Sequence, residues 1–288
     1  MLVFLNGKFV PERKAVVSVF DRAFLYGDGL FETMRIANGR PFRWEQHMQR
    51  LEQGAAFLRI KLPFSPAKLH ALVIKLAARN KTRDTLLRLT LSRGVGAPGY
   101  SPRNAKSPVL VMSLRPLPKM GQGNVTQWNV ITSSFRLPAG DPLAVFKTCN
   151  KLSQVMARAE ADAAGADEAL LANTSGFVVE GASSNLFWLR RGVLFTPPLA
   201  AGILPGVTRT VVMEIASRLK IPLRQKNIRL RELLQSEGVF LSLSSFGVVE
   251  VKSLDGSVLK RSPLTAQIAR AYEELLLNSS ACNIRPEP

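Results

Sequence analysis

Lys147 is a residue whose type and surroundings could support chemistry. It lies in the segment AVFKTCNKL, directly after three apolar residues. Burial of a lysine favours its uncharged form, and an uncharged amine can attack a carbonyl carbon to form an imine. Many lysines with apolar neighbours instead extend the ammonium group to water. The neighbourhood alone leaves both interpretations of Lys147 open.

Three other segments contain residues that could bind phosphate or pair with a cation. In GILPGVTR (202–209) a Pro-Gly turn precedes a predicted helix, where free N–H groups either attract phosphate or are simply capped. In FLSLSSFG, the hydroxyls of Ser242, Ser244 and Ser245 could donate to phosphate or form a turn. Glu180 follows an apolar run, and it would need a cationic partner if it were buried.

Hydrophobic periodicity predicts the elements that carry these residues. Alternation around Asn6-Gly7 predicts a hairpin over residues 1–10. Further strands are predicted at 31–36, 85–92, 108–114, 125–132, 168–172, 177–180, 185–189, 193–196 and 239–243. Helices are predicted at 44–58, from the N-cap Ser65 to 78, at 150–164, from 208, at 231–235 and at 264–277. Because strands and helices mix irregularly, we expect an α/β (α+β) fold and not a doubly wound sheet.

The segment PLPKMGQG (116–123) is the best candidate for a linker between domains. Two prolines and two glycines interrupt both the helical and the strand period within this segment. The sequence therefore predicts a smaller N-terminal α/β domain at 1–115 and a larger C-terminal mixed α/β domain at 124–288.

Composition disfavours several other classes of protein. The chain has 288 residues and a formal net charge of +18, but its basic residues are dispersed and form no recognisable nucleic-acid motif. Two cysteines and two histidines offer little for disulfides or for a metal site, and we expect no metal. No apolar run approaches the roughly 20 residues of a membrane span, and the N-terminus does not resemble a secretory signal. We therefore expect a cytoplasmic protein that does not bind membranes.

Taken in order, the motifs resemble the fold-type IV, or class IV, family of pyridoxal-phosphate (PLP) enzymes. This family includes branched-chain and D-amino-acid aminotransferases and 4-amino-4-deoxychorismate lyase. The similar segments are DRAFLYGDGLFETMR (21–35), EQHMQRL (45–51), FKTCNKL (146–152) and the long run 167–209. The resemblance covers nearly the whole chain, and it implies a two-domain PLP-binding fold and a homodimer.

The resemblance also implies a role for each matching residue. Lys147 would form the Schiff base with PLP and would then move the proton at the substrate Cα. Glu180 would pair with the pyridinium nitrogen, Leu204 would pack on the ring, and Arg50 would bind the phosphate. The remaining cofactor-binding residues that it implies are Ser183, Ser184, Asn185, Gly206, Val207, Thr208, Ser244 and Ser245. On the substrate side it implies the aromatic Phe31, while Arg35, Arg88 and Arg93 are candidates to bind a carboxylate or to form ordinary surface ion pairs.

The family contains two reactions between which the sequence gives mixed signals. The loop SRGVGAPGYSP (92–102) and the absence of a Gly-Gly-Asn run after Lys147 resemble the lyases. Pro98 stands where such lyases often have arginine, and GASSNLF (181–187) is closer to the transaminases. We therefore expect an aminotransferase that acts on a small amino acid or amine and a keto acid, with the lyase as the alternative. A basic nucleic-acid-binding protein is a more remote alternative.

Overall fold

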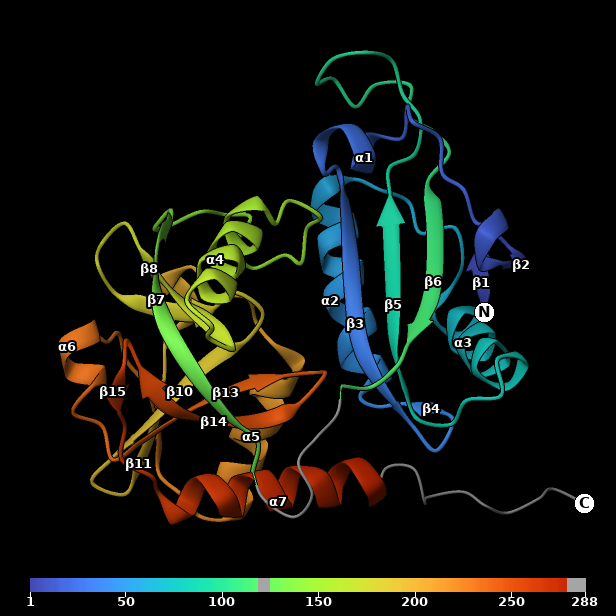
Figure 1. Ribbon diagram of the computed structural model, residues 1–288. Coiled ribbons are helices and arrows are strands. Elements are labelled where there is room, and N and C mark those ends of the chain that lie inside the picture. Colours follow the sequence, from blue (N-terminus) through green and yellow to red (C-terminus); the bar gives the residue numbers. More distant parts are fainter. Residues whose placement is uncertain (119–124, 279–288) are drawn as a thin grey trace, which may run out of the picture. The chain divides into compact units, whose positions relative to one another are not determined.

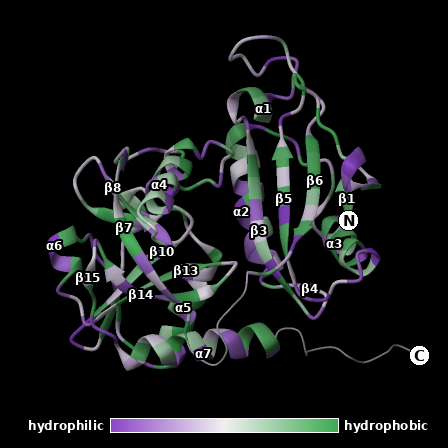
Figure 2. Cartoon of the chain, in the orientation of Figure 1, coloured by the Kyte–Doolittle hydropathy of each residue, from purple (hydrophilic) through white to green (hydrophobic). Residues whose placement is uncertain are grey.

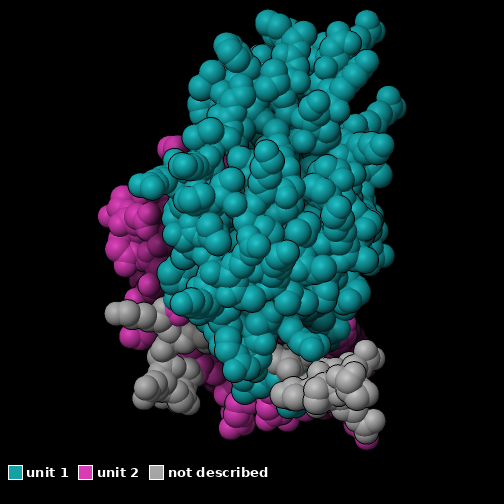
Figure 3. Space-filling view, turned by 90° about the vertical axis from the view of Figure 1, so that its right-hand side faces the viewer, with its two compact units in different colours: residues 1–117, 146–150, 276–288 teal, residues 118–145, 151–275 magenta. Residues whose placement is uncertain are grey.

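The computed structural model describes residues 1–118 and 125–278, which form two compact units. The first unit comprises Met1–Leu117, Phe146–Asn150 and the described part of Leu276–Pro288. The second comprises Lys151–Leu275 and the described part of Pro118–Val145 (Figures 1 and 3). Residues 119–123 of the predicted linker lie outside the described residues, and the predicted domain division remains a prediction. Phe146–Asn150 belong to the first unit, although a single domain boundary at the linker would assign them to the second.

The first unit is built on an antiparallel sheet with the strand order β2-β1-β6-β5-β3-β4. Its strands are β1 (Leu2–Leu5), β2 (Lys8–Pro11), β3 (Gly29–Ala37), β4 (Arg40–Pro41), β5 (Thr85–Ser92) and β6 (Val109–Arg115). Its helices are the 3-10 turn η1 (Glu12–Lys14), α1 (Arg22–Tyr26), α2 (Trp44–Leu58) and α3 (Pro66–Arg79). The predicted first hairpin and the predicted helix over 44–58 are confirmed.

Helices α2 and α3 pack on one face of this sheet. Alternate residues of β5, namely Leu87, Leu89 and Leu91, are fully buried in the same apolar cluster as residues of both helices. The residues between them lie on the opposite face and are only partly buried, and Figure 2 shows the alternation in hydropathy along the strand. A period of two therefore gives this sheet one covered face and one face available for polar side chains.

The second unit contains a mixed sheet. Its strands are β7 (Gln127–Leu137), β8 (Glu168–Asn173), β9 (Val178–Gly181), β10 (Asn185–Arg190), β11 (Val193–Thr196), β12 (Leu223–Gln225), β13 (Gly238–Leu243), β14 (Gly247–Leu254) and β15 (Ser257–Val258). Its other elements are α4 (Leu152–Ala163), the 3-10 turn η2 (Leu199–Ala201), α5 (Val207–Arg218) and α6 (Leu230–Leu233), and α7 (Pro263–Asn278) is the last described helix.

The mixed sheet closes on itself. The path β10-β13-β14-β7-β8-β9 returns to its start because β9 also pairs with β10. This closing pair joins Glu180, the residue before the last in β9, to Asn185 at the start of β10. Closure therefore brings together two residues that the sequence marks as cofactor-binding candidates.

Candidate active site

Lys147 is held by its backbone against the edge of β3. The N–H of Phe31 donates to the carbonyl of Lys147 at 2.9 Å, and the N–H of Cys149 donates to the carbonyl of Gly29 at 2.9 Å. Leu30 and Thr148 complete an antiparallel bridge between the two segments. The lysine backbone is thus fixed by a strand of the sheet, although Lys147 itself lies in no regular element.

The side chains of Lys147 and Arg88 both contact the ring of Phe31. The Lys147 Nζ lies 4.6 Å from the ring centroid, and the Arg88 Cζ lies 3.4 Å from it. Arg88 reaches the ring from β5, where it opposes Thr33 and is a diagonal neighbour of Phe31. Burial lowers the pKa of Arg88, but a guanidinium keeps its charge in proteins. One aromatic ring is thus contacted by an amine and by a partly desolvated cation that can bind an anion.

Arg50 forms a buried cluster with Glu32 and His47 on the other face of the same sheet. The Arg50 Nε and Nη2 donate to the two Glu32 carboxylate oxygens at 2.8 and 2.6 Å. The His47 Nδ1 lies 2.7 Å from Glu32 Oε2. Glu32, His47 and Arg50 are 0%, 2% and 8% exposed, respectively. The sequence predicted Arg50 as a phosphate ligand, but not its two buried partners.

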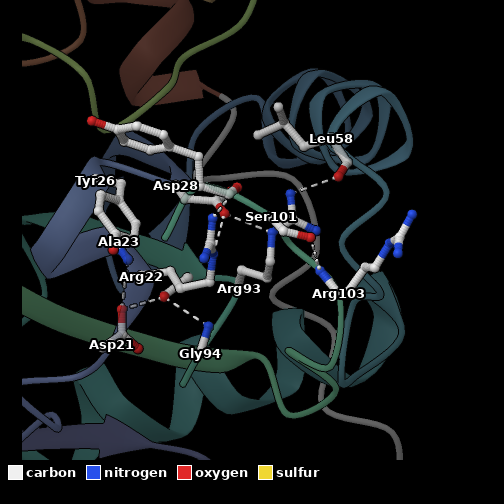
Figure 4. Close-up of polar contacts among 12 residues, drawn as sticks. Asp21, Arg22, Ala23, Tyr26, Asp28, Leu58, Arg93, Gly94, Ser101 and Arg103 are labelled. Carbon is white, nitrogen blue, oxygen red and sulfur yellow. Dashed lines mark hydrogen bonds and ion pairs between the residues drawn. The ribbon is translucent and has the colours of Figure 1, made fainter. Parts of the chain in front are cut away.

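Arg93 and Arg35 have surroundings that differ from those of Arg88. Arg93 donates from Nε to Asp28 Oδ2 at 2.7 Å and from Nη2 to the carbonyl of Leu58 at 2.8 Å (Figure 4). Arg22 donates to the same Asp28 oxygen at 2.8 Å. Burial raises the pKa of Asp28, but the hydrogen bonds and charges of the two arginines outweigh this and lower it. Arg93 therefore holds the end of α2, whereas Arg35 lies on the Phe31 face of β3, and substrate contact by either remains a prediction.

Glu180, Asn185 and Leu204 form one network in the second unit. The Glu180 Oε2 accepts from the Leu204 N–H at 3.0 Å and from Asn185 Nδ2 at 3.4 Å. The same Asn185 Nδ2 donates to the Leu204 carbonyl at 2.9 Å. The predicted ring-nitrogen partner and the predicted ring-packing residue are thus fixed to each other.

The start of α5 lies against this network. A Cβ on Gly206, the N-cap residue, would lie 1.9 Å from Asn185 Oδ1, so only glycine fits there without a shift. The N-cap residue Gly206 has no side chain to cap the first turn of this helix, in which Thr208 is buried. Ser244 and Ser245 lie half-buried in the turn after β13, a strand that α5 contacts. Uncapped N–H groups and a hydroxyl at a helix start suit a phosphate.

Ser183 and Ser184 are bound to a buried acid that the sequence analysis did not identify. Their hydroxyls donate to Glu168 Oε2 at 2.7 and 3.3 Å, respectively. Glu168 is the first residue of β8 and is 0% exposed. The two serines thus satisfy this carboxylate, and their contact with a cofactor remains a prediction.

The donor set fits PLP in each unit considered by itself. The first unit offers a lysine amine, an arginine held by a buried carboxylate, and a cation stacked on an aromatic ring. The second offers an acid for a pyridinium nitrogen and an uncapped helix start for a phosphate. Each group matches one chemical part of the cofactor.

A family model supports the same conclusion over most of the chain. The model of amino-transferase class IV matches residues 29–254. The chain belongs to this family. Class IV enzymes depend on PLP, and the family includes transaminases. The predicted mixed α/β fold in two domains, shared with class IV structures, is confirmed.

The class IV proteins to which the chain is similar have names that give different activities. The chain is 36% identical to a protein of Methanocaldococcus jannaschii whose name assigns it as a branched-chain-amino-acid aminotransferase, over 95% of this chain and 94% of that one. It is 31% identical to a D-alanine aminotransferase of Listeria monocytogenes, over 97% of each chain. It is 30% identical to the aminodeoxychorismate lyase of Bacillus subtilis, over 88% of this chain and 87% of that one.

A solved class IV structure superposes on nearly the whole chain. The branched-chain aminotransferase of Thermoproteus uzoniensis with norvaline matches with a TM-score of 0.91 at 32% identity, covering 96% of this chain and 95% of that one. Across residues 1–118 and 125–278, the search for a helix long and apolar enough to span a membrane finds none.

Proposed function

We propose that this class IV protein is a PLP-dependent aminotransferase that moves an amino group between a small amino acid or amine and a keto acid. The observation that carries the proposal is the placement of Lys147. Its backbone is paired with β3, and its Nζ lies 4.6 Å from the ring centroid of Phe31, which Arg88 also contacts. A lysine with a fixed backbone and an arginine on the same aromatic ring suit an enzyme that binds a cofactor covalently and a carboxylate substrate.

Specific residues of this chain would hold the cofactor. Lys147 would bind its aldehyde carbon, Arg50 and the residues Gly206, Val207 and Thr208 would bind its phosphate, and Glu180 would keep its ring nitrogen protonated. When bound, the cofactor supplies an electrophilic carbon and a ring that accepts electrons from the substrate Cα. The Lys147 amine would be the group placed to take the proton from the substrate Cα and to return it at C4′. Ser244 and Ser245 would add hydroxyl donors to the phosphate.

Arg88 is the best of the predicted arginines for binding the substrate carboxylate. It contacts the same ring as the Lys147 amine, and its burial strengthens the attraction to an anion. Arg35 shares the face of β3 on which Phe31 lies and remains a second candidate. The guanidinium of Arg93 is already bound to Asp28 and Leu58, which supports a structural role for it.

The second candidate function is aminodeoxychorismate lyase, which eliminates pyruvate to give 4-aminobenzoate. It is supported by the B. subtilis relative and by the loop over 92–102. Greater identity to the protein assigned as a branched-chain aminotransferase, and the motif at 181–187, favour transamination.

Two assays on the purified PLP-loaded protein distinguish these functions. Single D- and L-amino acids are added, and the absorbance of the Lys147-bound cofactor is followed as it converts to the pyridoxamine form. Pyruvate release from aminodeoxychorismate is measured separately. If the protein is an aminotransferase, amino acids of one configuration should convert the bound cofactor to the pyridoxamine form, and no pyruvate should be released. Pyruvate release without conversion by any amino acid would show that the protein is the lyase.

The class IV resemblance also supports assembly as a homodimer. Light scattering on the eluted protein measures its mass, and a value equal to one chain would contradict this proposal. Location in the cytoplasm remains a prediction from the sequence.

A further inference from the structure

Glu32 is a fully buried acid whose place in the fold is unusual. It lies on the helix-covered face of β3, with Leu30, Met34 and Ile36 of the apolar cluster on the same face. Burying a carboxylate carries a large desolvation cost, and a buried ion pair is often no more stabilising than apolar side chains of the same size. Stability alone therefore does not explain why β3 carries an acid at this position.

The partners of Glu32 fix the orientation of a guanidinium. Arg50 presents Nε and Nη2 to the two carboxylate oxygens at 2.8 and 2.6 Å, which is a bidentate pairing that sets the plane of the guanidinium. A carboxylate only accepts hydrogen bonds, so the His47 Nδ1 at 2.7 Å must donate to it. His47 and Arg50 lie three residues apart on α2 and therefore share a face of that helix.

One strand carries both Glu32 and the contact with Lys147. The side chain of Glu32 reaches Arg50 on one face of β3, while the backbone N–H of the preceding residue, Phe31, donates to the carbonyl of Lys147 at the edge of β3. The positions of Arg50 and Lys147 within the first unit are thus both set from adjacent residues of β3.

We infer that Glu32, itself oriented by His47, is a positioning residue that holds Arg50 at a set place relative to Lys147 to receive the cofactor's phosphate. This inference rests on the proposed function. It implies that the pair selects the phosphorylated cofactor over pyridoxal, which lacks the phosphate. Glu32 touches neither cofactor nor substrate in this role and acts only through Arg50.

Positioning and charge predict opposite effects of Glu32→Gln. The substitution removes a negative charge beside Arg50, so charge alone would tighten phosphate binding. If position decides, the freed guanidinium loses its fixed plane and the affinity for PLP falls. We expect a loss of about tenfold or more, the size of one misplaced charge-assisted hydrogen bond.

The experiment titrates the apoprotein with PLP and with pyridoxal and follows the absorbance of the cofactor bound to Lys147. Glu32→Gln should lower the affinity for PLP at least about tenfold and the affinity for pyridoxal less than about threefold. His47→Leu should also lower the affinity for PLP more than the affinity for pyridoxal. His47→Asn places an amide donor near the position of Nδ1 and should retain most of the wild-type preference. The thermal shift that inorganic phosphate gives the apoprotein should be lost in Glu32→Gln.

Failure of this inference and failure of the proposed function give different results. Wild-type protein that binds neither PLP nor pyridoxal would overturn the proposed function. The positioning role alone would be overturned if Arg50→Gln lost the wild-type preference for PLP while Glu32→Gln left that preference unchanged or increased it. Equal losses for PLP and pyridoxal in both Glu32→Gln and His47→Leu would also overturn it, because they would indicate a general structural defect.

Discussion

Acid titration of Glu32 gives a prediction whose size follows from the structure. Burial raises the pKa of this carboxyl, but Arg50 and His47 outweigh that effect and lower it from 4.5 to about 2. One pKa unit corresponds to about 1.4 kcal/mol, so the ionised form contributes about 3 kcal/mol to the free energy of unfolding. Because the folded pKa is the lower one, this contribution is complete above pH 4.5 and is lost as the pH falls toward about 2.

The assay compares urea unfolding of the apoprotein with and without Glu32→Gln, from neutral pH down to about pH 2. The comparison is read below pH 4.5, where the Glu32 carboxyl titrates. The difference in free energy of unfolding should shrink by most of about 3 kcal/mol as the pH falls. Glu12→Gln is the matched control for removal of a glutamate, because the Glu12 side chain is exposed. A Glu32 difference that stays constant with pH would refute the view that Arg50 and His47 hold the acid ionised.

Three further substitutions test other contacts. Ser65→Ala should lower the free energy of unfolding by about 1 kcal/mol in urea, because it removes the side-chain cap of α3, and no change would show that the cap contributes nothing. Gly206→Ala should weaken PLP binding in a titration of the apoprotein, since its Cβ would lie 1.9 Å from Asn185 Oδ1, and wild-type affinity would refute the close approach. Asp28→Asn should cost about 3 kcal/mol in urea, because two arginines lose a shared carboxylate, whereas Asp162→Asn in an exposed pair should cost at most about 0.5 kcal/mol. Equal effects of the two aspartate substitutions would contradict the central role of Asp28.

Elements with strong local signals could be predicted from the sequence. The helical spacing of apolar residues gave α2 (Trp44–Leu58), and Ser65 before Pro66 gave the start of α3. The strand β14 (Gly247–Leu254) was not predicted, because it is nearly all buried and follows serines that resemble the end of a structured segment. Its place is set by pairing with β13 and β7, which is not a local property.

The candidate site was predictable only in part. Lys147, Glu180 and Gly206 stand in motifs that resemble class IV enzymes, so their types and order were sufficient to select them. The roles of Glu32 and Asp28 depend on partners distant in the chain, and a single sequence does not show which side chains face each other. The pairing of Asp28 with Arg93 joins residues 65 positions apart and requires the fold itself.

The central claim is that Lys147 binds PLP covalently, and the most direct measurement locates the lysine that does so. Apoprotein is loaded with PLP and reduced with borohydride, which fixes the cofactor to the lysine that it occupies, and the digested protein is mapped by mass spectrometry. We predict the added mass on the peptide that contains Lys147, and its absence in Lys147→Ala. Label on another lysine, or no label in protein that retains PLP, would contradict the account.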